Sequence, residues 1–326
     1  MFQSADAYPR TTTSDIIPHA HETLSDAQRP NLKEFALASG HILGNYFFKL
    51  QHLHYGYWPN GLKVSIHNLA LAQQAYCDLL IGSIPQGVRR ILDVGAGAGG
   101  LTRQLLDRGY YVDCVSPSPF LTPRLRENVG ATNRIFEQRF EQLNTLETYD
   151  LVLFAESLQY IPLSRVFKQS ARLLSNNGYI LISDFFRNTD DEASPIGGGH
   201  PFAEVPHAAE AWGLQVVRDE DITTQTAPTL DVANDIMLQA VRPIWEMAVA
   251  THRARYPRLS RFLLWCCRKR IEKFEHKHFR DGRTSESFCK FKTYRLLVLR
   301  NCVASGVDDT EGPCSEIARD RPLTTK

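Results

Sequence analysis

The sequence lacks several features that mark secreted, membrane-spanning or nucleic-acid-binding proteins. Its 326 residues include seven cysteines, an odd number without a C-x-x-C pair. That pattern favours reduced thiols over a disulfide framework. No apolar run is long enough to span a bilayer, and the N-terminus lacks the basic-then-apolar order of a signal peptide. A formal net charge of +1 gives no electrostatic reason to expect nucleic acid. We therefore expect a cytoplasmic protein.

Metal-ligand clusters at recognisable spacing are also missing from the sequence. The pair His276 and His278 is a poor site, because side chains two residues apart on a helix point in different directions. The sequence therefore predicts no metal.

The most informative stretch is a short apolar run at residues 91–94, followed by glycine-rich residues 95–100 and helical spacing over 101–106. A strand, a glycine turn and a helix form the opening of a nucleotide-binding βα unit. Glycine permits φ values that a Cβ forbids, and it lets a ligand approach the backbone closely. The N-terminus of the helix then offers N–H groups to a carboxylate or phosphate.

Two ligand classes use this arrangement. Gly95, Gly97 and Gly100 match the dinucleotide pattern G-x-G-x-x-G, which is a weak signal alone. Asp93 lies two residues before the first glycine, where dinucleotide folds usually keep an apolar strand. The stretch D-V-G-A-G-A-G resembles the first motif of class I S-adenosylmethionine-dependent methyltransferases, in which an acid precedes three alternating glycines.

Segments of strand length alternate with helical patterns along the chain, and this order predicts an α/β fold with a doubly wound, mostly parallel, seven-stranded sheet. The arrangement L-L-x-x-x-G-Y-I-L-I-S-D at residues 173–184 is similar to the same family. In that family the last strand inserts antiparallel beside the sixth. Strands are expected at residues 91–94, 110–115, 135–136, 150–154, 179–184, 216–217 and 288–300.

The predicted domain organisation follows from composition and from this resemblance, and it has six parts. They are a disordered arm (1–30), a helical cap (31–86), a cofactor-binding core (87–222), a helical lid (223–287), the last strand of the core (288–302) and a disordered tail (303–326).

The resemblance implies S-adenosylmethionine as the cofactor, bound over the glycine loop. The implied contacts in that loop are Asp93, Gly95, Ala96, Gly97 and Gly99.

Two positions depart from the family pattern. Ser116 stands where most members have an acid on the ribose hydroxyls, so its hydroxyl or the neighbouring backbone is the implied contact. After the third strand, Arg139, Phe140 and Glu141 replace an acid followed by a small residue. The adenine contact therefore stays open between the Phe140 backbone and Glu141.

The run H-Y-G-Y-W at residues 54–58 resembles the N-terminal cap of small-molecule methyltransferases such as the sterol, tocopherol and quinone-ring enzymes. The resemblance implies that Tyr57 covers the cofactor and that Tyr55 and Trp58 line the acceptor pocket. An aromatic packing seam between cap and sheet is the alternative. Gln159 and Trp245 complete the predicted substrate-binding residues.

Four residues are candidates for proton transfer: Glu156, His200, and His52 and His54 beside the aromatic cap, for which packing is the alternative. His200 leads, because its loop follows the fifth strand. Glu156 follows the fourth strand, where the family's strand end faces the transferring methyl group; a structural acid bonded to backbone N–H groups is the alternative. His200 follows three glycines, and its pKa would be near neutrality if unperturbed, so it is a candidate general base. The alternative for His200 is a surface or loop-anchoring residue.

The predicted function is methyl transfer to oxygen or carbon of a small, partly apolar metabolite. An NAD-dependent oxidoreductase and a non-catalytic module that binds S-adenosylmethionine or lipid are the alternatives. Basic residues crowd the stretch 253–277. That stretch is either solvated surface or a contact for an anionic substrate, a carrier protein or a membrane surface.

Overall fold

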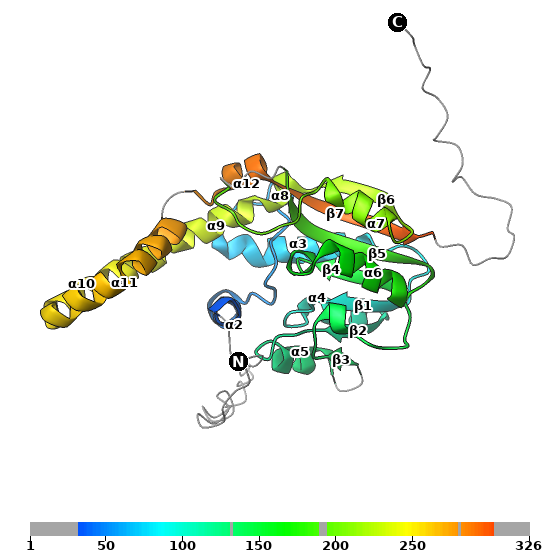
Figure 1. Ribbon diagram of the computed structural model, residues 1–326, viewed down its shortest axis with the longest axis horizontal. Helices are drawn as coiled ribbons and strands as arrows, with labels where there is room; N and C mark the ends of the chain where they lie inside the picture. Colours follow the sequence, from blue (N-terminus) through cyan, green and yellow to red (C-terminus); the bar gives the residue numbers. More distant parts are fainter. Residues whose placement is uncertain (1–31, 131–132, 189–193, 280–281, 303–326) are drawn as a thin grey trace, which may run out of the picture.

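The computed structural model describes residues 32–130, 133–188, 194–279 and 282–302. The predicted arm (1–30) and tail (303–326) lie outside the described residues. A single sheet forms the centre of the molecule, helices cover it, and a helical hairpin extends from one end (Figure 1).

The sheet has seven strands in the order β3-β2-β1-β4-β5-β7-β6. Neighbouring strands from β3 to β5 are parallel, whereas β7 pairs antiparallel with both β5 and β6. The predicted doubly wound, mostly parallel sheet with an antiparallel last strand is confirmed. The strands are β1 (Arg90–Val94), β2 (Tyr111–Val115), β3 (Ile135–Phe136), β4 (Tyr149–Ala155), β5 (Leu174–Arg187), β6 (Leu214–Asp221) and β7 (Lys292–Asn301).

Each face of the sheet carries its own apolar cluster, because successive strand residues point to opposite faces. In β1, Ile91 packs with helices on one face and Leu92 with helices on the other. Both residues are fully buried, as expected for a parallel sheet covered on both sides. The first face holds α3 (Leu69–Gly82), α4 (Gly100–Asp107) and α5 (Thr122–Val129); the second holds α6 (Leu163–Leu173) and α7 (Glu204–Glu210).

The last strand begins later than predicted, because its first residues form helix α12 (Ser285–Phe291). Thr284 caps this helix: its side-chain oxygen accepts a hydrogen bond from the backbone N–H of Ser287 at 3.2 Å. The reciprocal bond, from the Thr284 backbone to the Ser287 hydroxyl, completes a capping box. This local capping outweighs the strand-like apolar pattern of the segment.

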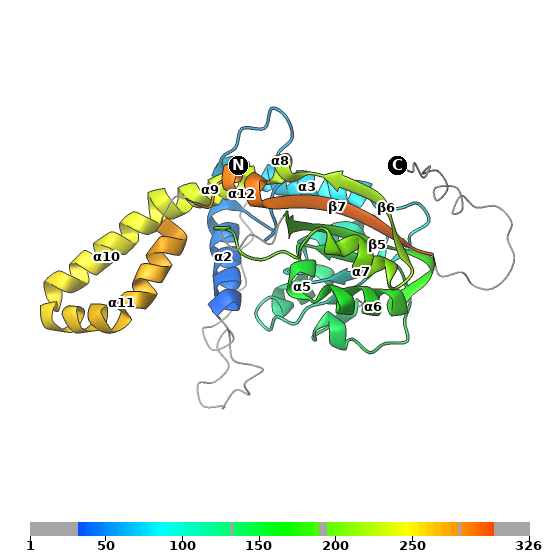
Figure 2. The same cartoon turned by 45° about the horizontal axis from the view of Figure 1, so that its top comes forward.

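The residues outside the core form the cap and the insertion between β6 and β7. Of the predicted cap (31–86), helix α3 packs on the sheet. The name cap is kept for the remaining parts, α2 (Leu32–Phe48), the segment 49–65 and η1 (Ile66–Asn68). The insertion is helical, as predicted, but α10 and α11 form a hairpin that extends away from the sheet (Figures 1 and 2). The helices of the insertion are α8 (Thr223–Thr226), α9 (Pro228–Ile236), η4 (Met237–Val241), α10 (Arg242–Arg255) and α11 (Pro257–Phe279).

Within the described parts of the chain, we find no helix with the length and apolar character needed to cross a membrane.

Candidate active site

The glycine loop between β1 and α4 uses its glycines for two different purposes. Gly95, Gly97 and Gly99 all have positive φ, at 78°, 58° and 86°. A Cβ on Gly95 would lie 2.5 Å from Cβ of Ser157, and one on Gly99 would lie 2.8 Å from a methyl carbon of Leu125. At Gly97, by contrast, a Cβ would meet no described heavy atom within 4 Å. The outer glycines therefore permit packing, and Gly97 faces open space where a ligand can approach.

Hydrogen bonds hold this loop against three neighbouring elements. The N–H of Gly95 donates to the carbonyl of Val115 at 2.8 Å, and the Asn128 amide donates to the carbonyl of Ala98 at 2.7 Å. The Ser157 hydroxyl donates to the carbonyl of Val94 at 2.5 Å. The first N–H groups of α4 have no intrahelical acceptor, so this fixed loop presents donors to an anionic group.

Asp93 lies beneath the loop and does not face the open space. Its carboxylate is buried and accepts a hydrogen bond from the Thr102 hydroxyl of α4 at 2.6 Å. Burial raises the pKa of Asp93 to about 6, partly opposed by the Thr102 bond. We interpret Asp93 as a positioning residue that fixes α4 against β1, instead of the direct cofactor contact that the sequence predicts.

The side chains of Ser116 and Phe140, two of the predicted ribose and adenine residues, are buried and contact other parts of the protein. Ser116 is 2% exposed, and its hydroxyl accepts a long bond from the Thr122 hydroxyl at 3.4 Å. The ring of Phe140 is buried edge-on to Phe154. Only the backbone of Phe140 and the side chain of Glu141 therefore stay candidates for the adenine contact.

The cap segment is anchored by close packing and by one threonine of the insertion. A Cβ on Gly56 would lie 2.5 Å from Cβ of Ala72, so this glycine permits close approach to α3. The Thr229 hydroxyl accepts bonds from the N–H of Gly56 and from the indole N–H of Trp58, both at 3.0 Å. Trp58 is 5% exposed and packs against α3 and α9. The ring of Trp58 therefore occupies the packing seam that was the alternative to substrate binding, and its place in the acceptor pocket stays a prediction.

Tyr57 also belongs to this seam. Its N–H donates to the carbonyl of Ala72 at 2.8 Å, and its ring packs at the edge of the core. Tyr57 is only partly buried. Its predicted place over the cofactor stays a prediction.

Glu156 links the cap to the last strand at the end of β4. Its Oε1 accepts hydrogen bonds from the backbone N–H of Tyr55 and the hydroxyl of Tyr294, both at 2.7 Å. The Tyr294 hydroxyl in turn lies 2.9 Å from that of Tyr76. Burial, reinforced by the charge of Asp184, raises the pKa of Glu156 to about 8 against those two bonds. The bond from the Tyr55 N–H is the backbone contact expected of a structural acid, and the role of Glu156 in proton transfer stays a prediction.

Three aromatic rings lie around the ring of Tyr55, whose backbone N–H binds this carboxylate. The Tyr55 ring lies 5.8–6.2 Å from the rings of Phe185, Phe288 and Tyr294. Tyr55 is partly buried, and the other three rings are buried. The sequence predicts Tyr55 as a site residue but not Phe185, Phe288 and Tyr294. Those three residues lie on β5, α12 and β7, which come together only in the folded chain.

Asp184 of β5 binds Gln159, which lies in the short 3-10 helix η3 (Leu158–Tyr160) after β4. Its carboxylate accepts from the backbone N–H of Gln159 at 3.1 Å and from the Gln159 side-chain amide at 3.3 Å. Burial raises the pKa of Asp184 to about 7, opposed by these and other bonds. Asp184 thus fixes Gln159, three residues after Glu156, and the sequence alone does not predict this role of Asp184.

Two other predicted residues have structural contacts that do not bring them to Glu156. Nε2 of His200 lies 2.9 Å from the carbonyl of Ile161 and 3.3 Å from that of Leu158, so this nitrogen is a donor. The contacts match the alternative of a loop-anchoring histidine, and we do not carry the general-base assignment forward. Trp245 lies in the hairpin, where its indole N–H donates to Glu275 at 3.0 Å and its ring packs on Phe274. The structure therefore does not support Trp245 as a substrate residue.

Comparisons with known proteins identify the family of this chain. A family model described as a methyltransferase domain matches residues 69–235. A methyltransferase of a Geobacillus strain is 28% identical over 157 residues, which are 42% of this chain and 63% of the relative. A ubiquinone biosynthesis O-methyltransferase of Bradyrhizobium diazoefficiens is 29% identical over 139 residues, or 41% of this chain and 55% of the relative. The chain thus spans less than two thirds of the length of these curated relatives.

Solved structures of low sequence identity share the fold. A geranyl diphosphate C-methyltransferase from Streptomyces coelicolor superposes with a TM-score of 0.56 at 17% identity, covering 83% of this chain and 98% of that one. The cyclopropane synthase MmaA2 from Mycobacterium tuberculosis gives 0.54 at 18% identity, with coverages of 83% and 98%. The family match extends over about half of the sequence and includes the glycine loop, Glu156 and most of the cap's anchoring partners on α3 and α9. The chain therefore belongs to the methyltransferase domain family.

Proposed function

We propose that this protein transfers the methyl group of S-adenosylmethionine to an oxygen or carbon atom of a small, partly apolar acceptor. The observation that carries the proposal is the open face of Gly97, in a rigid loop at the N-terminus of α4, within a chain of the methyltransferase family. The rival reading as an NAD-dependent oxidoreductase rests only on the glycine spacing, which this family shares.

The cofactor-binding residues supported by this geometry are those of the glycine loop. The free N–H groups at the start of α4 suit the methionine carboxylate, and the open side of Gly97 admits the ligand backbone. Asp93 supports the loop from below through Thr102. S-adenosylmethionine supplies an electrophilic methyl group on a sulfonium; the protein's own task is to hold, orient and desolvate the partners.

The acceptor site is best supported around Glu156. The rings of Tyr55, Phe185 and Phe288 favour an apolar acceptor, and aromatic faces also tolerate a nearby cation. In the transfer, a bond forms between the acceptor atom and the methyl carbon while the carbon–sulfur bond breaks. The proton lost by the acceptor passes to the carboxylate of Glu156, whose raised pKa suits a base working near neutral pH.

The experiment is to incubate the full chain with S-adenosylmethionine and panels of phenolic, hydroxy-acid and enolisable acceptors. We expect one S-adenosylhomocysteine per product, and a product heavier by one methylene unit in the mass spectrum. Binding of S-adenosylmethionine with no product from any acceptor class would support the non-catalytic module instead. Reduction of NAD with no cofactor demethylation would overturn the proposal.

We further propose that the protein is cytoplasmic and that the hairpin docks on an anionic membrane surface. Each of the six cysteines among the described residues is a free thiol, which suits a reducing compartment. Helices α10 and α11 carry ten basic and three acidic residues, a formal charge of +7, in a chain whose net charge is +1.

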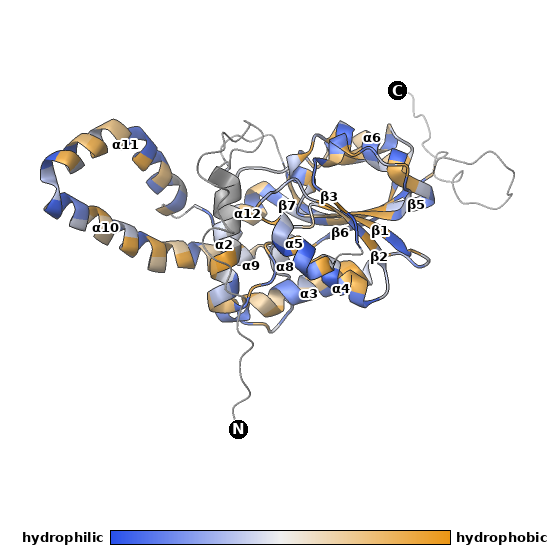
Figure 3. Cartoon of the chain, turned by 90° about the horizontal axis from the view of Figure 1, so that it is seen from below, coloured by the Kyte–Doolittle hydropathy of each residue, from blue (hydrophilic) through white to orange (hydrophobic). Residues whose placement is uncertain are grey.

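Hydrophobic and hydrophilic residues alternate along both helices of the hairpin (Figure 3), and several of its large apolar side chains are exposed. Trp265 is 75% exposed, and Ile244 and Phe262 are 62% and 59% exposed. Exposed aromatic residues beside a dense positive charge are typical of helices that lie at the lipid interface. Such a contact would bring a lipophilic acceptor to the site.

Vesicle flotation tests this docking. The full chain should bind vesicles containing phosphatidylglycerol, bind pure phosphatidylcholine far less, and lose binding in high salt. The double substitution Trp265→Ala and Phe262→Ala should weaken binding. Leu146→Ala should not, because Leu146 is fully exposed but lies outside the hairpin. Failure to bind anionic vesicles, or binding only to an acidic carrier protein, would overturn the membrane proposal.

A further inference from the structure

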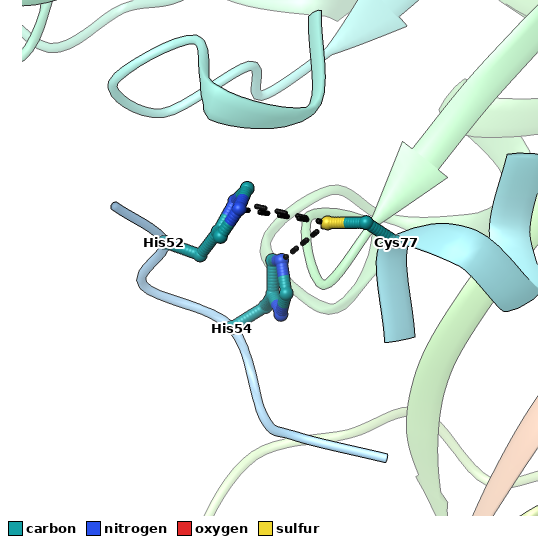
Figure 4. A group of neighbouring side chains, drawn as sticks. All are labelled: His52, His54 and Cys77. Atoms are coloured by element: carbon teal, nitrogen blue, oxygen red, sulfur yellow. Dashed lines mark hydrogen bonds between the residues drawn. The ribbon is translucent and has the colours of Figure 1, made fainter. Parts of the chain in front are cut away.

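Three side chains that the proposed reaction does not use converge between the cap and α3. They are His52, His54 and Cys77, and their ligand atoms all lie within 4.8 Å of one another (Figure 4). The sulfur of Cys77 lies 3.4 Å from Nε2 of His54 and 3.7–3.8 Å from the two ring nitrogens of His52. Figure 4 shows both rings turned toward the sulfur.

The sulfur–nitrogen distances of 3.4–3.8 Å are close to those of donors around a tetrahedral metal ion. Zinc binds thiolate sulfur at about 2.3 Å and imidazole nitrogen at about 2.0–2.1 Å, which separates the two donors by about 3.5 Å in a tetrahedron. Zinc is commonly held by cysteine and histidine together, and three protein ligands leave a fourth position for water.

His54 is already in the tautomer that a metal ligand requires. Its Nδ1 lies 2.7 Å from the carbonyl of Tyr55, so Nδ1 carries the proton and Nε2 directs its lone pair toward Cys77. Metal-binding histidines usually donate their second N–H to a carbonyl or carboxylate in this way.

Gln73 binds the backbone of both histidines, and it lies on the same face of α3 as Cys77. Its amide nitrogen donates to the carbonyls of His52 at 3.2 Å and His54 at 2.8 Å. Gln73 and Cys77 are four residues apart, one helical turn. The Gln73 Oε1 is buried without a hydrogen-bond partner among the residues that the structure describes. An unused buried acceptor costs stability, and a metal-bound water is a donor that would satisfy it.

We propose that His52, His54 and Cys77 form a binding site for a zinc ion, with water as the fourth ligand. On binding, the Cys77 thiol releases its proton to solvent and a metal–sulfur bond forms, so no oxidant or reductant is needed. The prediction of no metal came from sequence spacing. Cys77 lies 23 residues after His54, and only the fold brings them together.

The site would join the cap to the cofactor loop. The His52 ring lies against the first residue of α4, since a Cβ on Gly100 would be 2.7 Å from Cε1 of His52. A zinc ion here would therefore fix the segment that leads into Tyr55, and so would order the cap beside the active site.

Cobalt substitution tests this proposal on the full chain. Metal-free protein titrated with Co²⁺ should develop a thiolate-to-cobalt absorption band in the near ultraviolet and intense visible bands of tetrahedral cobalt, saturating at one ion per chain. Zn²⁺ should abolish both. Cys77→Ser and His54→Gln should remove the thiolate band, whereas Cys289→Ser, at an exposed cysteine, should keep it. Gln73→Leu should weaken Co²⁺ binding by about 10–100-fold, as loss of a supporting contact does.

The alternative is an S–H···N hydrogen bond from Cys77 to His54 with no metal. Folded wild-type protein that gives no thiolate band and holds no stoichiometric zinc after purification would establish this alternative and overturn the proposal. That result requires only the wild-type chain, so it does not depend on any variant folding.

Discussion

Gly97→Ala is the substitution that most cleanly separates ligand binding from protein packing. Gly97 has φ of 58°, and an added Cβ would meet no described atom within 4 Å. The change therefore introduces left-handed backbone strain of about 1–2 kcal/mol and no protein clash. If the open space holds the cofactor, the same methyl group also collides with it. We expect S-adenosylmethionine affinity to fall at least about tenfold, which corresponds to about 1.4 kcal/mol.

Gly87→Ala is the matched control for this experiment. Gly87 also has positive φ, at 85°, and also has open space where a Cβ would stand, but it lies in the turn before β1. Both variants should lose similar stability in urea denaturation. Only Gly97→Ala should lose affinity in titration calorimetry. Equal affinities in the two variants would refute the placement of the cofactor over Gly97.

Four further predictions concern the acceptor site and the cap. Glu156→Gln keeps acceptors for Tyr55 and Tyr294 but removes the base, so turnover should fall by about 10²–10⁴-fold and the rise of activity through a pH of about 8 should disappear; an unchanged pH–rate profile would move the base elsewhere. Because the folded-state pKa of Glu156 is raised from 4.5 to about 8, wild-type stability should decline as pH rises through that window, and urea titrations of Glu156→Gln should show a smaller decline. His200→Gln should lose about 1 kcal/mol of stability with the bonds to Leu158 and Ile161 but keep the pH profile, and loss of the acid limb would restore the general-base role. Gly56→Ala should destabilise by about 1–3 kcal/mol through its clash with Ala72, and Ala72→Gly in the same chain should restore stability; no rescue would mean that the clash is not the cause.

The sequence predicts the core well because local patterns determine it. The run at residues 91–94 is apolar, short and followed by glycines, and it forms β1 and its loop as expected. Strand order and the antiparallel β7 follow from the family resemblance together with the alternation of strands and helices. The start of β7 could not be read from apolar content, because the Thr284 capping box gives residues 285–291 a helical alternative.

Site residues are harder to predict, because a residue's type does not reveal which way its side chain faces. Trp58 and Tyr55 lie three residues apart in one aromatic run, yet Trp58 fills a seam against α9 and Tyr55 lies beside Glu156. Tyr294 and Phe288 reach the same place from the other end of the sequence. The grouping of His54 with Cys77 likewise depends on α3 packing against the cap.

The most direct test of the central claim is titration of the full chain with S-adenosylhomocysteine in a calorimeter, with NAD as the competing ligand. We expect one S-adenosylhomocysteine site per chain, displaced by S-adenosylmethionine and unaffected by NAD. Saturable binding of NAD at that site, or no binding of S-adenosylhomocysteine to folded protein, would contradict it.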